Sequence, residues 1–233
     1  MNQILMRYLI LFKHLFKSSI QLTYGVWKIS HLPAPIVTIF GGARLKQTDF
    51  FAQKAHELSH RLVQANISVI SGGGTGIMEA VNCGAIFKKT EKMKMRTLGI
   101  TVKGLEPLNV CAKNFITLDH FFARKWLMIN YSVAFAVFPG GFGTLDEFAE
   151  VITLLQTQKL LPGVPVILFG RDYWDPFMNW LHESALKYGL VSLEDINLIR
   201  ITDDVYEAFC LLQERCELCK KCIAELNNKW EQK

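Results

Sequence analysis

The sequence lacks the features of a membrane-spanning or nucleic-acid-binding protein. No stretch of 18 or more residues is both strongly apolar and free of charge, so a helix that crosses a membrane is not expected. Basic residues form no long run, and a net charge of +5 on 233 residues suits small anionic ligands rather than nucleic acid. Internal repeats, low-complexity tracts and a clear linker are also missing. Because half of the residues are apolar, we expect one domain with a substantial core.

The six cysteines lack the spacing of a disulfide framework or a metal site. Two are isolated, and four cluster near the C-terminus: Cys83 and Cys111, then Cys210, Cys216, Cys219 and Cys222. A Cys-x-x-Cys-x-x-Cys run can begin an iron–sulfur site, but the fourth ligand and the trailing proline of that pattern are missing. Two-pair zinc spacing is absent as well. We therefore expect reduced thiols, no metal and a cytoplasmic protein.

Two familiar phosphate-binding signatures are absent too. A P-loop needs Gly-x-x-x-x-Gly-Lys-Ser/Thr, and no glycine turn here is followed by Lys-Ser or Lys-Thr. The dinucleotide fingerprint needs Gly-x-Gly-x-x-Gly, and its third glycine is replaced by Ile77 in one turn and by Asp146 in another. NTP hydrolysis and nicotinamide chemistry therefore lose most of their support. A single nucleotide or a sugar phosphate remains as the ligand.

Residues 1–34 are predicted to form an amphipathic helical extension. Apolar residues recur at helical spacing, and polar or basic residues gather on the other side: Ile4, Leu5, Tyr8, Leu9, Phe12, Leu15 and Phe16 against Gln3, Arg7, Lys13, His14 and Lys17. One interpretation is a basic helix lying on a membrane. The other, which we favour, is a helix packed on its own domain or on a partner subunit. A signal peptide fits poorly, because Lys13 and His14 interrupt the apolar region.

Strand-like and helix-like segments alternate regularly from residue 35 to residue 205. Strands are predicted at 36–40, 67–71, 98–102, 115–118, 133–138, 164–169 and 198–201, and helices at 49–65, 77–87, 121–131 and 174–188. This alternation predicts an α/β fold, a Rossmann-like doubly wound parallel sheet in three layers. Residues 35–205 would be the nucleotide-binding catalytic domain, and 206–233 a C-terminal helix that carries the cysteines.

Three of the strands end in glycine-rich turns, at residues 41–44, 72–76 and 139–143. In a parallel sheet, ligands bind beyond the carboxyl ends of the strands, so these turns can build one site together. A turn that opens a helix offers free backbone N–H groups and the positive end of the helix dipole to a phosphate. The third turn is the centre of the predicted site, since its glycines let a ligand approach the backbone. The predicted phosphate-binding residues are Gly140, Gly141, Gly143 and Thr144, with Gly73 and Gly74 from the second turn.

Glu147 places a carboxylate on the first helical turn after the third glycine turn. It has a structural alternative, because residues 144–147 match the capping box, in which the Thr144 and Glu147 side chains would cap the helix reciprocally. Glu79 is a rival carboxylate, one turn into the helix after the second glycine turn. It could equally be an ordinary acid stabilised by the helix dipole.

Arg124 and Lys125 are the only charged residues in the apolar segment 121–131. A helix this apolar is mostly buried, and burying an unpaired guanidinium costs several kcal/mol. Arg124 therefore needs an anionic partner, either a protein carboxylate or a ligand. Lys125 could instead extend to the surface.

The motifs at 121–125 and 139–147 together resemble the LOG ("Lonely guy") family. They read Phe-Phe-Ala-Arg-Lys and Pro-Gly-Gly-Phe-Gly-Thr-Leu-Asp-Glu, and the family signature is an Arg-Lys pair followed by Pro-Gly-Gly-x-Gly-Thr-x-x-Glu. The resemblance covers roughly residues 37–205 and includes the stretches at 72–80 and 168–174, the latter similar to the longer bacterial subgroup. Members are cytokinin riboside 5′-monophosphate phosphoribohydrolases, many formerly mislabelled lysine decarboxylases.

The resemblance implies that Arg124 and Glu147 are the catalytic pair and that residues 140–144 hold the 5′-phosphate. It implies a nucleoside monophosphate substrate, no cofactor, and a homodimer or larger homo-oligomer. Residues with a less certain role in substrate binding are Gly42, Arg44, Glu79, Lys125 and Asn109. The first glycine turn departs from relatives, which often have Gly-Ser there, and the match around Asn109, near the expected base pocket, is loose.

The implied reaction fits the residues. Hydrolysis of an N-glycosidic bond passes through an oxocarbenium-like state, which a carboxylate can stabilise. The leading hypothesis is an enzyme that cleaves AMP or an N6-substituted adenosine monophosphate to free base and ribose 5-phosphate. The alternative is a non-catalytic carrier of a nucleotide or of molybdenum cofactor with the same fold. A third possibility is a membrane-surface regulator that uses residues 1–30.

Overall fold

The computed structural model describes residues 3–86, 96–105 and 107–231, with side chains described as far as residue 221. Its core is a seven-stranded parallel sheet in the order β4-β3-β2-β1-β5-β6-β7. The strands are β1 Ile36–Phe40, β2 Ser68–Ser71, β3 Thr97–Val102, β4 Phe115–Leu118, β5 Ala134–Val137, β6 Val166–Phe169 and β7 Ile199–Thr202. The chain winds outward from β1 in one direction and from β5 in the other, so the predicted doubly wound α/β fold is confirmed.

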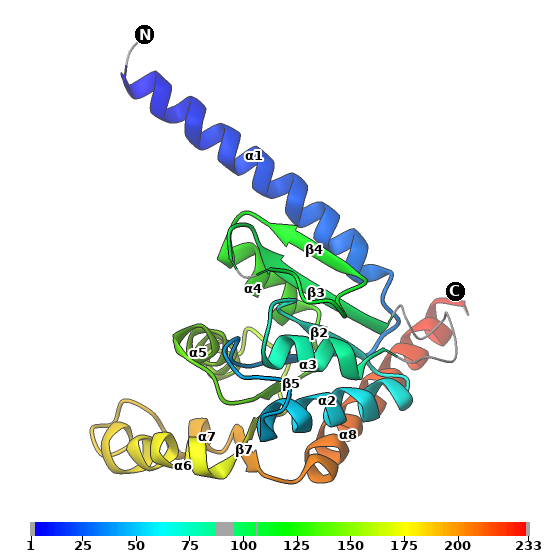
Figure 1. The fold of residues 1–233 in the computed structure, drawn as a ribbon, viewed down its shortest axis with the longest axis vertical. Coiled ribbons are helices and arrows are strands. Elements are labelled where there is room, and N and C mark those ends of the chain that lie inside the picture. Colours follow the sequence, from blue (N-terminus) through cyan, green and yellow to red (C-terminus); the bar gives the residue numbers. More distant parts are fainter. Residues whose placement is uncertain (1–2, 87–95, 106, 232–233) are drawn as a thin grey trace.

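Helices cover both faces of the sheet and give the predicted three layers (Figure 1). Helices α2 (Phe50–Gln64), α3 (Ile77–Gly84) and α8 (Val205–Glu231) supply one apolar cluster, and α4 (Phe121–Asn130), α5 (Phe142–Gln156) and α6 (Arg171–Trp180) supply the other. Side chains of a strand alternate between faces, so Val37 and Ile39 enter the first cluster while Ile36 and Phe40 enter the second. The central strands are buried on both faces, which explains their continuous apolar sequences.

The helix predicted at 174–188 starts earlier and is divided. Helix α6 begins at Arg171, directly after Gly170, whose φ of +106° favours glycine. The chain then continues into a π-helical turn, η2 (Leu181–Ala185), and a short helix α7 (Leu193–Ile196) precedes β7. Ser192 caps α7 in a capping box with Asp195.

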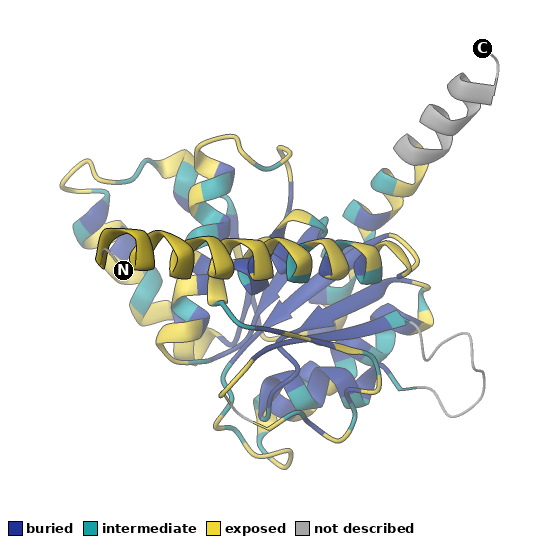
Figure 2. Ribbon diagram, turned by 90° about the horizontal axis from the view of Figure 1, so that it is seen from above, coloured by how far each residue is buried: buried dark blue, intermediate teal, exposed yellow. Residues whose placement is uncertain are grey.

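Helix α1 (Gln3–Ser30) has buried residues only in its second half (Figures 1 and 2). Its buried residues are Ser18, Gly25 and Ile29, whereas residues 3–17 are all exposed. The Lys17 ammonium is 2.5 Å from the Asp119 carboxylate, and Gly25 packs against Leu127 of α4. The favoured interpretation was a helix packed on its own domain or on a partner subunit, and packing on its own domain is wrong for residues 3–17. No helix among the described residues is long and apolar enough to cross a membrane.

Cys83 and Cys111 form a disulfide, which corrects the expectation of reduced thiols for this pair. Cys83 lies near the end of α3, and Cys111 lies in the loop between β3 and β4. They are 28 residues apart in sequence but meet because β2 and β3 are neighbours in the sheet, with a Cα–Cα distance of 5.0 Å. The link ties this loop to α3.

The C-terminal cysteines form no bond with one another in the part of the chain described. Cys210, Cys216 and Cys219 are free thiols, and the side chain of Cys222 lies outside the described residues. Burial raises the pKa of Cys216 to about 12, so its thiol stays protonated at neutral pH. No group of three His, Cys, Asp or Glu side chains in the described ranges is placed to hold a metal ion.

Candidate functional site

The three glycine turns lie side by side at the carboxyl edge of the sheet. They follow β2, β1 and β5, which are neighbouring strands, and the direction of winding reverses between β1 and β5. Backbone hydrogen bonds join the turns directly: the Gly42 N–H donates to the Pro139 carbonyl (3.0 Å), and the Ile77 N–H donates to the Gly42 carbonyl (2.9 Å). The switch point of a doubly wound sheet is its usual ligand crevice.

Arg124 and Glu147 form a buried ion pair next to these turns. The Arg124 Nη2 atom is 3.1 Å from Glu147 Oε1, and each side chain is 10% exposed. Arg124 comes from α4, which leads into β5, and Glu147 comes from α5, which leaves it. The buried guanidinium thus has the anionic partner that its burial requires, and that partner is a protein carboxylate.

The capping interpretation of Glu147 is wrong in this structure. Helix α5 starts one residue after Gly141, which is its N-cap, and no side-chain hydrogen bond caps it. Thr144 therefore lies inside the first turn rather than at the cap position, so it cannot begin a capping box with Glu147. The Glu147 carboxylate is left to interact with Arg124.

The burial of Glu147 changes its acidity. Desolvation raises the pKa of Glu147 to about 7, and the Arg124 charge opposes this shift without cancelling it. Carboxylates of neighbouring Asp146 and Glu150 raise the pKa further, and the Lys125 ammonium lowers it. A carboxyl group that titrates near neutral pH beside a fixed cation is typical of a catalytic site.

Arg124 keeps unused hydrogen-bonding capacity. Its buried Nε atom has no hydrogen-bond partner among the described residues, and its Nη2 atom also contacts the Met78 sulfur at 3.7 Å. A guanidinium has five N–H donors, so the pair with Glu147 leaves donors for a ligand.

The turn before α5 is open. Ideal Cβ atoms built on Gly141, the N-cap, and on Gly143, in the first turn of α5, would meet no atom within 4 Å among the described residues, apart from the adjoining backbone. The Tyr173 hydroxyl holds the turn in place by donating to the Gly140 carbonyl. Gly140 itself is closely packed, since a Cβ there would collide with Thr144. Thr144 itself is buried. This arrangement leaves backbone accessible at the N-terminus of a 15-residue helix.

The turn at 72–76 is closely packed instead. Gly73 has a φ of +72° and approaches Gly99 of β3, and a Cβ on Gly72 would collide with the Arg124 guanidinium and Met78. Asn109 is buried, and its amide donates to the Gly73 and Gly74 carbonyls (2.9 and 2.8 Å). The structure therefore places Asn109 behind this turn as a support.

The other predicted substrate residues do not join the Arg124–Glu147 pair. Arg44 is exposed, and Glu79 accepts a hydrogen bond from Gln47 (3.3 Å). Lys125 lies 2.9 Å from Asp146 and 2.7 Å from Glu150, so its charge is used to link α4 to α5.

Two residues of the site were missed by sequence reasoning, Met78 and Tyr173. Met78 contacts the Arg124 guanidinium, and Tyr173 holds the open turn. Both lie in segments that match the family, at 72–80 and 168–174, but their residue types carry no chemical signal on their own. Their part in the site can be recognised only from the residues that they contact in the folded structure.

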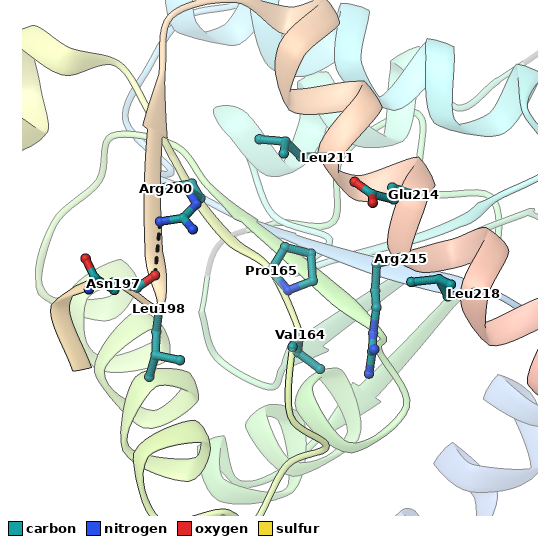
Figure 3. A pocket seen from close by; sticks show the side chains of 10 residues that line it. Val164, Pro165, Asn197, Leu198, Arg200, Leu211, Glu214, Arg215 and Leu218 are labelled. Atoms are coloured by element: carbon teal, nitrogen blue, oxygen red, sulfur yellow. Dashed lines mark hydrogen bonds between the residues drawn. The ribbon is translucent and has the colours of Figure 1, made fainter. Parts of the chain in front are cut away.

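A separate hollow of about 290 Å³ lies at the opposite edge of the sheet (Figure 3). It opens beside the amino ends of β6 and β7, between Val164, Leu198 and Arg215. Neither Arg124 nor Glu147 lines it. It is therefore distinct from the site at the glycine turns.

Comparisons with known proteins identify the family of the chain. The family described as "Possible lysine decarboxylase" matches residues 78–212. A cytokinin riboside 5′-monophosphate phosphoribohydrolase of Arabidopsis thaliana is 29% identical over 183 residues, covering 76% of this chain and 82% of the relative. A probable enzyme of the same name from rice, Oryza sativa subsp. japonica, is 26% identical over 200 residues, covering 84% of this chain and 78% of the relative.

Solved structures share the fold at lower sequence identity. The molybdenum cofactor binding protein of Rippkaea orientalis has a TM-score of 0.52 and 23% identity, covering 82% of this chain and 98% of that chain. The molybdenum cofactor carrier protein of Chlamydomonas reinhardtii has a TM-score of 0.55 and 19% identity, covering 78% of this chain and 98% of that chain. At these identities the likeness concerns the fold alone.

Proposed function

Because the chain belongs to the LOG family, we propose that it is a nucleoside 5′-monophosphate phosphoribohydrolase. The substrate is AMP or an N6-substituted, cytokinin-type adenosine monophosphate, and the products are the free base and ribose 5-phosphate. The catalytic domain is residues 35–205. The curated relatives named above carry this activity in their names.

The observation that carries the proposal is the buried Arg124–Glu147 pair beside an open glycine turn. Breaking the N-glycosidic bond leaves positive charge on the anomeric carbon and the ring oxygen of the ribose. An ionised Glu147 stabilises this cation in a site that largely excludes water, where a charge interaction is strong. The base departs with the electron pair of the broken bond and takes up one proton, and water adds to the anomeric carbon and loses one proton.

The phosphate has a separate binding place in this proposal. Residues 140–144 and the N-terminus of α5 hold it by backbone N–H groups, with Gly73 and Gly74 beside them. Arg124 uses its free donors to hold the substrate against Glu147. Since the phosphate is remote from the broken bond, its binding energy positions the ribose.

The assembly and location follow the same family resemblance. We expect a homodimer or larger homo-oligomer in the cytoplasm. Light scattering after gel filtration would measure the number of chains, and a monomer that retains full activity would contradict the oligomer.

The test is chromatographic detection of free base after incubation with AMP or N6-isopentenyl-AMP. Wild type should release base, and Glu147→Gln, which keeps the shape of the side chain but loses its charge, should not. The matched control is Glu57→Gln, the same change on a carboxylate that pairs with Arg61 on α2. Absence of base release from every purine and pyrimidine monophosphate would overturn the proposal.

The same experiment separates the enzyme from a carrier of the same fold. A carrier would bind nucleotide or molybdenum cofactor tightly and release no base, with Glu147→Gln retaining the binding. The retained pair of Arg124 and Glu147 favours the enzyme.

A further inference from the structure

The first half of α1 exposes an unusual amount of apolar surface. Residues 3–17 project from the domain (Figure 1) and are coloured as exposed (Figure 2), and their large apolar side chains are 43–71% exposed. A soluble monomer rarely presents a contiguous apolar surface of this extent without a partner that covers it. The question is which partner fits its chemistry.

The apolar residues are arranged on one side of the helix. At 100° per residue, one arc of about 120° holds Leu5, Tyr8, Leu9, Phe12, Leu15 and Phe16. The opposite arc holds Arg7, Lys13 and Lys17, together with the apolar Met6 and Ile10. The helix is thus amphipathic, with every formal charge on its polar side positive.

The positive charge of α1 indicates which kind of partner covers its apolar side. No Asp or Glu occurs before Asp49, and within the described residues Arg7 and Lys13 form no ion pair. We propose that residues 3–17 bind the surface of an anionic lipid membrane, with the helix axis in the plane of the headgroups and the apolar arc in the acyl region. Docking this apolar arc on the same arc of a second copy would leave Arg7 and Lys13 on the outer side of the helix pair, and the segment itself carries no acid to pair with them.

The dimensions agree with binding at the surface rather than insertion across it. Fifteen helical residues span about 22 Å, less than the hydrocarbon thickness of about 30 Å. The apolar side continues toward the domain through Ile20 and Trp27, which are 55% and 56% exposed, and Tyr24 stacks on Trp27. Trp and Tyr are the side chains that favour the headgroup level of a membrane. Lys17, paired with Asp119, marks where the helix joins the domain.

The experiment is co-sedimentation of the full-length protein with extruded vesicles at physiological salt. Vesicles of phosphatidylcholine alone are compared with vesicles that contain 30% phosphatidylserine, a proportion chosen at roughly the anionic content that attracts basic segments. We expect most of the protein to pellet with the anionic vesicles and little with the neutral ones. Protein that stays in solution with both, or pellets equally with both, would overturn the proposal.

Two double variants test which residues act. Leu9→Glu with Phe12→Glu should lower the fraction bound by more than about tenfold, because both side chains belong to the apolar arc. The matched control is Leu161→Glu with Leu190→Glu, the same charge change at side chains that are 69% and 73% exposed on the domain, and it should bind as wild type does. Equal binding by all three proteins would exclude α1 as the lipid-binding element.

Circular dichroism and light scattering complete the test. The variants should keep the thermal transition of wild type, since the four positions are exposed. If wild type does not bind vesicles and the Leu9 and Phe12 changes instead reduce the number of chains per particle, the membrane proposal fails. The apolar arc is then an interface between copies of the chain.

Discussion

The two glycine turns at 72–76 and 139–143 look alike in sequence, yet they have opposite surroundings. In the first, glycine is needed because the space is already filled by Arg124, Met78 and the backbone of neighbouring turns. In the second, Gly141 and Gly143 face open space. One turn therefore builds the wall of the site, and the other leaves room for a ligand. Glycine content alone does not distinguish a packed turn from a binding turn.

The largest effect on stability is expected at the packed turn, from Gly76→Ala. Gly76 has a φ of +66°, and a Cβ there would lie well under 3.0 Å from the Gly42 carbonyl. Because the colliding atoms are backbone, we expect a loss of at least about 3 kcal/mol in the free energy of unfolding. Urea denaturation measures the free energy of unfolding. A loss below about 1 kcal/mol would show that the backbone of this turn can move to make room for the methyl group.

Removing the disulfide should have the next largest effect. The Cys83–Cys111 disulfide joins two residues that are 28 apart in sequence, and it holds the β3–β4 loop, which bears Asn109. The double change to Ser should lower the free energy of unfolding by about 3 kcal/mol. Cys210→Ser, at an exposed free thiol, is the control and should leave stability unchanged. Equal stabilities of wild type with and without reductant would contradict this expectation.

Gly72→Ala should act on activity more than on stability. The added methyl group would collide with the ends of the Arg124 and Met78 side chains, which can move. Moving Arg124 displaces it from Glu147, and misplacement of about 1 Å can cost on the order of 100-fold in rate. Base release and urea denaturation, measured on the same protein, separate the two effects. Unchanged activity would indicate that the position of Arg124 is not critical.

The pH dependence tests the carboxylate of the pair. If ionised Glu147 is the active form, kcat/KM should fall about tenfold per pH unit below its pKa, which is about 7, and level off above it. The sign follows from burial, which raises the pKa above the usual value and so reduces the ionised fraction at pH 6. Activity that falls as pH rises through 7 would instead assign Glu147 as the donor of a proton to the leaving base.

The smallest effect on folding is expected at the open turn, from Gly143→Ala. No atom meets the added Cβ, and Ala favours the first turn of α5 by up to about 1 kcal/mol over Gly. Stability should stay the same or rise, while KM for the nucleotide should increase because the methyl group enters the predicted phosphate position. An unchanged KM would place the phosphate elsewhere.

The sequence predicted most of the fold because its signals are local. Strand segments, their order along the chain and the three turns follow from apolar runs that end in glycine. The burial of Arg124 was predictable from the apolar residues around it, as was its need for an anion. These inferences use only chain neighbours, and they predicted the elements that position the site.

The errors concern contacts between distant segments. The capping box at 144–147 was misread because the N-cap of α5 is Gly141 rather than Thr144, which leaves Glu147 free to pair with Arg124. Pairing of Cys83 with Cys111 depends on the adjacency of β2 and β3, which spacing does not reveal. The exposure of residues 3–17 was missed because amphipathic spacing does not say what covers the apolar side.

Arg124 and Glu147 come from the two helices that flank β5, an interior strand of the sheet. Amides in such a strand exchange with solvent only when the whole domain opens, while edge strands and termini open locally. The two side chains therefore move with the slowest-exchanging part of the molecule. Heating should abolish catalysis and the folded state at the same temperature, with no inactive folded intermediate between them.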